Sequence, residues 1–377
     1  IMNHTHHVKT GIVLGGGAPN SSLIAGALVA FAEREMEFDV MSTSGAGALM
    51  GLLYTCPQGG DRIDALSRWA QIGVSDELYK LFPVNHKVFM KPGDHAHQFR
   101  QAMAKNPWVQ WHREMFPQGS FMHDMFQLAW ASMTPSNLNT KSLGLCAHLP
   151  FVEEYVDFDL AHRMPGEFYF NAFNLDTSSM EVWNKEQLSA ERIRAAFSFP
   201  LIYPPYEVDG HWYIEGASIE PLNFEVMTRP EVEEHVDVVI VADILGSYRL
   251  LQKPRNLYDA WVKSIITPLV KIAHSDTKMY KMQMAQHGKT VLQLDFYKNV
   301  PDAWLPEIFD WSDSNLKRLF EVGYQTGQEF LDEHGLLLGL LPATGKPART
   351  HHAAVRQMHH TSPLSPTRLF ENALAMF

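Results

Sequence analysis

The chain has 377 residues, enough for one large domain or two ordinary ones. Apolar residues make up 46% of it, so a substantial core can be buried. Its formal net charge of -11 argues against nucleic acid as a main partner. The two cysteines, Cys56 and Cys146, are too few for a disulfide framework, and this number suits a reducing compartment.

The first ten residues have no apolar core of the kind that a signal peptide needs. The longest apolar stretches, Val236–Leu245 and Gly335–Leu341, fall well short of the ~20 apolar residues of a membrane-spanning helix. We therefore expect a soluble, cytoplasmic protein. Peripheral contact with a membrane is compatible with this expectation.

The first 55 residues alternate between strand-like and helix-like patterns. Lys9–Leu14 is a candidate buried strand, and Asn20 or Ser21 can cap the helix that follows. Asp39–Met41 is a second candidate strand, and Ala46–Tyr54 is a second candidate helix. This order favours a parallel sheet with helices packed on it.

Residues 57–150 are broken by prolines and glycines and are rich in aromatic side chains. We expect a helical insertion that packs over the sheet, and ordinary core packing is the first explanation for its aromatic residues. Further strands are predicted at Gly166–Phe173, Met180–Trp183, Tyr206–Val208, Trp212–Ile214, Val236–Leu245 and Thr290–Phe296, and helices at Ala190–Ser198, around Trp261–Ile272 and at Trp311–His334. Together these patterns predict one α/β domain over residues 9–334, whose C-terminal part is 226–334, and a tail over residues 335–377.

Two turns made of small residues follow the first two strands. Gly15-Gly16-Gly17 separates a strand from a helix, and such a loop can direct backbone N–H groups at an anion. Met41–Leu49 passes from a strand through small residues into a helix. This is the architecture of a nucleophile elbow, in which a sharp turn exposes one side chain.

Together with one acidic motif downstream, these turns resemble the patatin-like phospholipase family. Gly15-Gly16-Gly17 is similar to the glycine-rich oxyanion loop of that family, and Thr43–Leu49 is similar to its elbow, Gly-Thr-Ser-Ala-Gly-Ala-Leu. Glu215-Gly216-Ala217 lies where the family has Asp-Gly-Gly or Asp-Gly-Ala. The runs Ala195–Pro200 and Tyr203–Pro205 also resemble the segment before the family's acid.

The resemblance covers residues 9–225 directly and extends more weakly to about residue 334. It implies a three-layer α/β/α fold with a mixed, mainly parallel central sheet and a helical insertion. It also implies hydrolysis or transfer of an acyl group on a lipid-like ester or thioester, by a serine–aspartate dyad and without a cofactor or metal. The implied site comprises Ser44, Gly45 and Glu215 for catalysis, Gly15, Gly16 and Gly17 for the oxyanion, and Gly216 and Ala217 beside the acid.

The chain departs from the family pattern at both members of the dyad. With the residues from Ala46 onward in register, the nucleophile position falls on Gly45, and Thr43 stands where the family has glycine. The acid position is Glu215 instead of aspartate. A serine hydroxyl needs a base to become a nucleophile, so both departures bear directly on the chemistry.

Three hypotheses follow, and the sequence leaves them open. In the first, the elbow is shifted by one residue and Ser44 attacks the ester. In the second, Gly45 is the elbow residue, and the longer Glu215 enters the vacated space to activate a water beside Gly15–Gly17. In the third, the site is inactive and the protein binds a lipid, an acyl group or a partner. An acid–base enzyme that stabilises an enolate in the same loop is an alternative of a different class.

Overall fold

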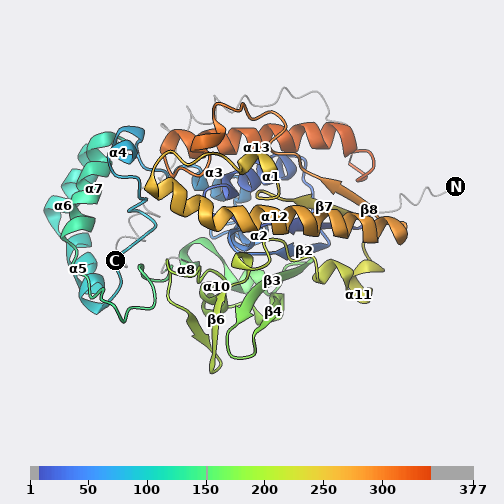
Figure 1. The fold of residues 1–377 in the computed structure, drawn as a ribbon, viewed down its shortest axis with the longest axis horizontal. Coiled ribbons are helices and arrows are strands. Elements are labelled where there is room, and N and C mark those ends of the chain that lie inside the picture. The colour runs from blue at the N-terminus through green and yellow to red at the C-terminus, as the bar shows by residue number, and fades with distance from the viewer. Residues whose placement is uncertain (1–7, 150–151, 341–377) are drawn as a thin grey trace.

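The computed structural model describes residues 8–149 and 152–340 of the chain (Figure 1). Its centre is an eight-stranded sheet in the order β5-β6-β3-β2-β1-β7-β8, with β4 paired to β3. The strands are β1 (Thr10–Leu14), β2 (Val40–Thr43), β3 (Glu167–Asn174), β4 (Ser179–Asn184), β5 (Tyr206–Val208), β6 (His211–Glu215), β7 (Val238–Ala242) and β8 (Thr290–Gln293). Neighbours among β3, β2, β1, β7 and β8 run parallel, whereas β4, β5 and β6 pair antiparallel, so the sheet is mixed and mainly parallel as predicted.

Helices flank this sheet and complete the three layers of the predicted patatin-like α/β/α fold. They are α1 (Ser21–Glu33), α2 (Ala46–Thr55), α3 (Arg62–Trp69), α4 (Asp76–Leu81), α5 (Asp94–Ala104), α6 (Pro107–Met115), α7 (Phe121–Met133), α8 (Val152–Tyr155), α9 (Phe158–Ala161), α10 (Ala190–Ala196), α11 (Pro230–Glu233), α12 (Leu257–Gln286) and α13 (Asp313–His334). Helices α1, α2, α3 and α13 pack together, and α12 contacts β8. Right-handed crossovers place α12 on the face opposite α1, because β1→β2 and β7→β8 run in opposite directions along the sheet.

The packing of α1 against α13 depends on glycine. A Cβ at Gly26 would overlap the carbonyl oxygen of Phe320, and one at Gly323 would overlap that of Leu23. The two backbones therefore approach each other without side chains between them. Twelve of the thirteen residues of α1 are buried, which agrees with its apolar composition.

The start of α1 differs from the prediction that Asn20 or Ser21 caps it. The side chain of Asn20 makes no capping bond. Its Nδ2 instead donates to the hydroxyl of Tyr297 at 2.8 Å, and the hydroxyl of Ser21 donates back to the carbonyl of Ala18. The capping prediction is wrong because Asn20 has helical backbone angles and the bond to Tyr297 holds its side chain away from the end of α1, so the capping acceptor Oδ1 has no partner among the described residues.

The strand register brings three loops to one edge of the sheet. Leu14 of β1 lies between Thr43 of β2 and Ala242 of β7. The loops that leave these strands therefore begin side by side. From β1 the chain passes to β2 on one side, and from β7 it passes to β8 on the other side. The carboxyl ends of β1 and β7 therefore form a topological switch point, the place where open α/β sheets bind ligands.

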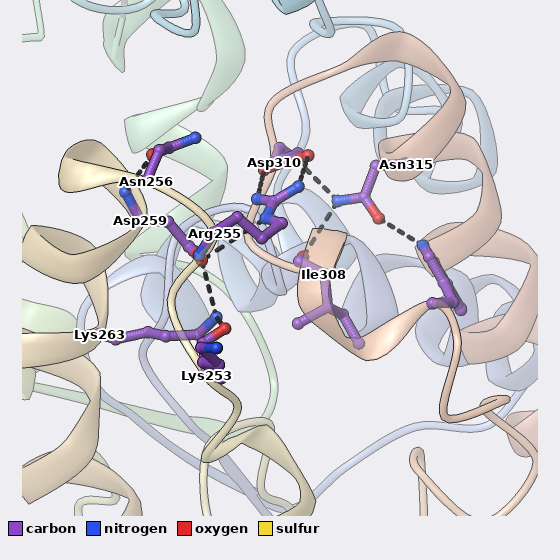
Figure 2. A network of polar contacts seen from close by, with 9 residues as sticks. Lys253, Arg255, Asn256, Asp259, Lys263, Ile308, Asp310 and Asn315 are labelled. Carbon is purple, nitrogen blue, oxygen red and sulfur yellow. Dashed lines mark hydrogen bonds and ion pairs between the residues drawn. The ribbon is translucent and has the colours of Figure 1, made fainter.

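A polar network fixes the start of α12 to the segment before α13 (Figure 2). The guanidinium of Arg255 pairs with Asp310, with its Nη2 2.8 Å from Oδ1, and the backbone N–H of Arg255 donates to Asp259. Lys263 also donates to Asp259 at 2.9 Å. Although burial alone would raise the pKa of Asp259, the hydrogen bond from Lys263 and the nearby Arg255 lower it, so the carboxylate stays ionised.

Residues 82–145, here called the insertion lobe, extend from one end of the sheet and include α5, α6 and α7 (Figure 1). Their buried apolar residues are only four: Met90, Ala96, Ala104 and Val109. The lobe therefore has little core of its own. The predicted tail from residue 341 onward lies outside the described residues.

Candidate active site

Gly45 occupies the sharp turn between β2 and α2. Its backbone has φ +48° and ψ −130°, a conformation that is costly for any residue with a side chain, and α2 begins at the next residue. This is the strand–turn–helix geometry of a nucleophile elbow. The structure thus places the elbow at Gly45, where no side chain is present.

The hydroxyl of Ser44 is directed into the core. Ser44 is fully buried, and its Oγ lies 2.8 Å from Oδ1 of Asn171 and 2.9 Å from the carbonyl oxygen of Glu220. Its single proton can be donated to only one of these two acceptors at a time. Ser44 is not among the residues that line the cavity described below.

The carboxyl of Glu215 lies over Gly45. Glu215 ends β6 and precedes a short 3₁₀ helix, Gly216–Ser218. A Cβ at position 45 would overlap Oε1 of Glu215 and would lie 2.7 Å from the Cβ of Ala217. The glutamate therefore fills the space that a side chain at the elbow would need.

The rest of the acidic motif packs against the glycine loop and β3. A Cβ at Gly16 would overlap the Cβ of Ala217, and one at Gly216 would lie 2.6 Å from Oδ1 of Asn171. Position 16 must therefore be glycine while alanine stands at 217. This contact joins the loop after β1 to the segment after β6.

Burial changes the acidity of Glu215. Only 8% of the residue is exposed, and the described residues give its carboxyl no hydrogen-bonding partner. Burial disfavours the charged form and raises the pKa of Glu215 to about 8. Near neutral pH the group is mostly protonated, and a small rise in pH makes it a base of useful strength.

Only some of the backbone N–H groups around the glycine loop are available to bind a ligand. The N–H of Gly15 donates to the carbonyl of Ala242 at 3.1 Å, and that of Gly16 donates to the carbonyl of Pro221 at 2.9 Å. Among the described residues, the amides of Gly17 and Ala46 have no acceptor, and both residues line the cavity. Ala46 is the first residue of α2, where a helix offers unpaired N–H groups.

A cavity of about 800 Å³ opens beside Glu215, between the carboxyl edge of the sheet, the insertion lobe and α12. Its walls are largely apolar, with Leu49 of α2 and Trp261 of α12 among them. Glu215 is the one carboxylate among the described residues that line it. The polar lining residues from the lobe are His86, Lys87, Lys91, Arg100, His112, Arg113, His123, Gln127, Ser132 and Thr134.

Sequence patterns did not single out any individual lobe residue as part of the site. Helical spacing offered one signal, because Val109, His112 and Arg113 lie on one face of α6 and all line the cavity. His86 is 8% exposed, and neither of its ring nitrogens has a hydrogen-bonding partner among the described residues. Burial lowers the pKa of His86 to about 4, so its ring is neutral near pH 7.

Two wider features of the described residues concern metals and membranes. No group of three or more histidine, cysteine or carboxylate side chains within 8–149 and 152–340 is arranged to hold a metal ion. Over the same ranges, every helix is too short or too polar to span a bilayer.

Comparison with known proteins gives one family match and two distant structural matches. The patatin-like phospholipase family model matches residues 12–228, which is more than half of the chain. VipD from Legionella pneumophila is 13% identical over 94% of this chain and 75% of that one, with a TM-score of 0.36. The ExoU–SpcU heterodimer from the type III secretion system of Pseudomonas aeruginosa matches at 14% identity over 98% of this chain and 68% of that one, with a TM-score of 0.24. No curated protein matches significantly. On the family match, the chain belongs to the patatin-like phospholipase family.

Proposed function

We propose that this protein hydrolyses a lipid-like acyl ester or thioester with a water molecule that Glu215 activates, without an acyl-enzyme intermediate. One observation carries the proposal: the carboxyl of Glu215 lies over Gly45, where other members of the family would present a serine. The elbow turn is retained, its nucleophile is absent, and an acid–base group fills the space.

The reaction balances with Glu215 as the only group that exchanges protons. The ionised carboxylate accepts a proton from water while the water oxygen attacks the acyl carbonyl. When the tetrahedral intermediate collapses, the carboxylic acid returns that proton to the departing alkoxide or thiolate. The products are a carboxylic acid and an alcohol or thiol, and Glu215 ends as it began.

The oxyanion of the tetrahedral intermediate needs hydrogen-bond donors beside Glu215. The amides of Gly17 and Ala46 are the best candidates, because both residues line the cavity and neither amide has an acceptor among the described residues. One preorganised donor of this kind is typically worth ~3–4 kcal/mol in the transition state. Gly15 and Gly16 contribute by holding the loop, since their amides bond to Ala242 and Pro221.

The cavity fits a long apolar substituent. Its volume of about 800 Å³ lies within the roughly 300–1,000 Å³ that is typical of small-molecule sites. Apolar side chains from α12 and the insertion lobe surround it, so an acyl chain would be removed from water along most of its length.

A second function is favoured by the protonation of Glu215. With a pKa of about 8, the carboxyl is mostly neutral near pH 7 and can donate a hydrogen bond to a bound carboxylate or carbonyl. A protein that retains a fatty acid or acyl lipid without turnover would need no more than this. The two functions share one site and differ only in whether a water reaches Glu215.

Turnover of a long-chain thioester and of its ester analogue separates the hypotheses. Glu215→Gln should remove activity. Ser44→Ala should keep activity, although the variant protein is less stable. Glu207→Gln is the matched control, because Glu207 is an exposed glutamate. No residue should be labelled by a fluorophosphonate. Labelling of Ser44, or loss of activity in Ser44→Ala with normal ligand binding, would establish the shifted serine. Retention of a lipid by the parent without turnover would establish the binding function.

A further inference from the structure

Tyr203 brings to the cavity a hydroxyl that the proposed hydrolysis leaves without a role. The residue lines the cavity, although only 7% of it is exposed. Among the described residues, its hydroxyl has no hydrogen-bonding partner and is not sealed off by its neighbours. A buried tyrosine normally finds a partner for its O–H group, because a buried donor without one costs free energy. A ligand in the cavity can supply this partner.

The backbone before β5 places Tyr203 close to Glu215. The carbonyl of Ser198 accepts the N–H of Glu215 at 3.0 Å, and the N–H of Tyr203 donates to the carbonyl of Phe199 at 2.9 Å. One short turn of chain therefore contacts the backbone of Glu215 at its start and carries Tyr203 at its end. Burial is the main cause that raises the pKa of Tyr203, and Cys146 and Glu215 add to the rise, as expected if the carboxyl is near the phenol.

The ring of Tyr203 is held in one position by its neighbours. It stacks on the ring of His148, with the two centroids 6.1 Å apart, and His148 meets the ring of Tyr206 edge to face at 4.8 Å. A Cβ at Gly144 would overlap the backbone of Tyr203, so the chain is closely packed on this side as well. The phenol is therefore preorganised, which is what a hydrogen-bond donor to a reacting atom requires.

The order of the strands separates Tyr203 from the candidate oxyanion donors. Gly17 follows β1 and Ala46 follows β2, whereas Tyr203 lies just before β5, at the other edge of the sheet. Glu215 extends from the end of β6 to a position over Gly45, between the two groups of donors. In a tetrahedral intermediate the oxyanion and the departing atom are different substituents of one carbon. With the oxyanion directed toward β1, the departing atom is directed toward β5 and Tyr203.

We propose that the hydroxyl of Tyr203 donates a hydrogen bond to the departing oxygen or sulfur atom of the substrate, a role that rests on the proposed hydrolysis by Glu215. Glu215 still takes the proton from water and delivers it to the departing atom, so Tyr203 loses no proton. Because its pKa is raised, its hydroxyl stays protonated over the pH range in which Glu215 ionises. The hydrogen bond strengthens as negative charge develops on the departing atom. Sulfur is a weaker acceptor than oxygen, so this donor favours an oxygen ester over a thioester.

Tyr203→Phe in the full chain removes only this hydroxyl, and two esters of the same medium-chain acid test its role. The ethyl ester has a poor leaving group, and its kcat should fall by roughly 100-fold with KM unchanged, because the bond strengthens only as charge develops. The p-nitrophenyl ester has a leaving group that needs little stabilisation, so its kcat should fall by less than about threefold. The pH dependence of the remaining activity should match that of the parent, since Glu215 is still the base. The matched control is Tyr206→Phe, because Tyr206 contacts the same histidine but does not line the cavity.

Four results would overturn this role. Turnover of the ethyl ester by Tyr203→Phe at the parent's rate would remove the role of Tyr203 and leave that of Glu215 standing. Equal losses with both esters would assign the hydroxyl to the oxyanion instead of the departing atom. The urea midpoint of Tyr203→Phe should equal or exceed that of the parent, because the hydroxyl has no partner to lose, and a clear fall would mean that it supports the fold. If the parent turns over neither ester, the proposed hydrolysis and the role of Tyr203 fail together.

Discussion

Two walls of one cavity are built in contrasting ways. The sheet wall, around Gly16, Gly45 and Ala217, is packed so closely that a single added Cβ overlaps a neighbour. The lobe wall belongs to residues 82–145, which have only four buried apolar residues and many exposed ones. The sheet wall can hold reacting groups in a fixed geometry because its backbone has no room to shift. The lobe wall can change its surface residues at little cost in stability, which suits recognition of a partner.

The largest effect is expected from a substitution that disrupts the packing of α13 against α1, next to the sheet. Gly323→Ala would place a Cβ onto the carbonyl oxygen of Leu23 and force α13 away from α1. We expect a loss of more than about 3 kcal/mol in the free energy of unfolding, measured by urea denaturation. Ala102→Gly, at an exposed position of α5 in the lobe, should cost only about 1 kcal/mol. Equal losses in the two variants would contradict the contrast between the regions.

The next effect concerns the contact of Gly45 with Glu215. Gly45→Ser alone should lose roughly 2–3 kcal/mol and remain unlabelled by a fluorophosphonate, because its side chain overlaps the glutamate and strains the turn. Gly45→Ser/Glu215→Asp/Ala217→Gly shortens both obstructing residues. This triple variant should recover much of the stability and gain covalent labelling at residue 45.

The outcome for the triple variant depends on stability as well as labelling. If it folds as well as the parent and is still not labelled, the turn at Gly45 does not present a nucleophile. If Gly45→Ser is as stable as the parent, Glu215 does not occupy the place that we assign to it.

A third prediction follows from the pKa of Glu215. The folded-state pKa of about 8 is above the ordinary value of 4.5, so the folded protein binds this proton more tightly than the unfolded chain. This contribution to stability is fully present below about pH 4.5 and falls as pH rises toward about 8, with a slope of up to ~1.4 kcal/mol per pH unit. Glu215→Gln should remove that slope.

The measurement is the free energy of unfolding of parent and variant over this pH range. The difference between them should change in favour of the variant as pH rises. Glu207→Gln, on the exposed side of β5, should run parallel to the parent. A parallel course for Glu215→Gln would mean that folding does not raise the pKa of this carboxyl.

The smallest expected effect is in the lobe. Trp108→Ser/Trp111→Ser should change the free energy of unfolding by no more than about 0.5 kcal/mol, because both side chains are exposed. Urea denaturation checks this value in the absence of lipid. A loss of several kcal/mol would show that these tryptophans support the fold, and it would remove the contrast between the two walls.

Much of the sheet could be predicted from the sequence, because its strands are short apolar runs that end at glycine or other turn residues. The order strand–helix–strand–helix before residue 55 and the hairpin around Asp209-Gly210 are both confirmed. The strand predicted at Val236–Leu245 is shorter, Val238–Ala242, because Asp243 ends it by accepting N–H bonds from Leu245 and Gly246. The local pattern of apolar residues predicts well that such a strand exists, but it predicts the first and last residues of the strand less well.

The candidate site was only partly predictable, since its geometry depends on contacts between distant segments. The sequence marked Gly45 and Glu215 as departures from the family, but only the fold shows that one fills the space of the other. Periodicity could not show that Ser44 is directed toward Asn171, 127 residues away. The exposure of Trp108 could not be predicted either, because an aromatic residue in a helical pattern is expected first to be part of the core.

The contact between Gly45 and Glu215 also constrains the order of evolutionary change. A serine at 45 beside glutamate at 215 requires Glu215 or Ala217 to shift, whereas glycine at 45 leaves space for either acid. Starting from the family's serine and aspartate, the route to the present pair through glycine and aspartate therefore avoids the strained combination of serine and glutamate. On that route the nucleophile is lost before the acid lengthens, so acyl-serine chemistry ends before residue 215 changes.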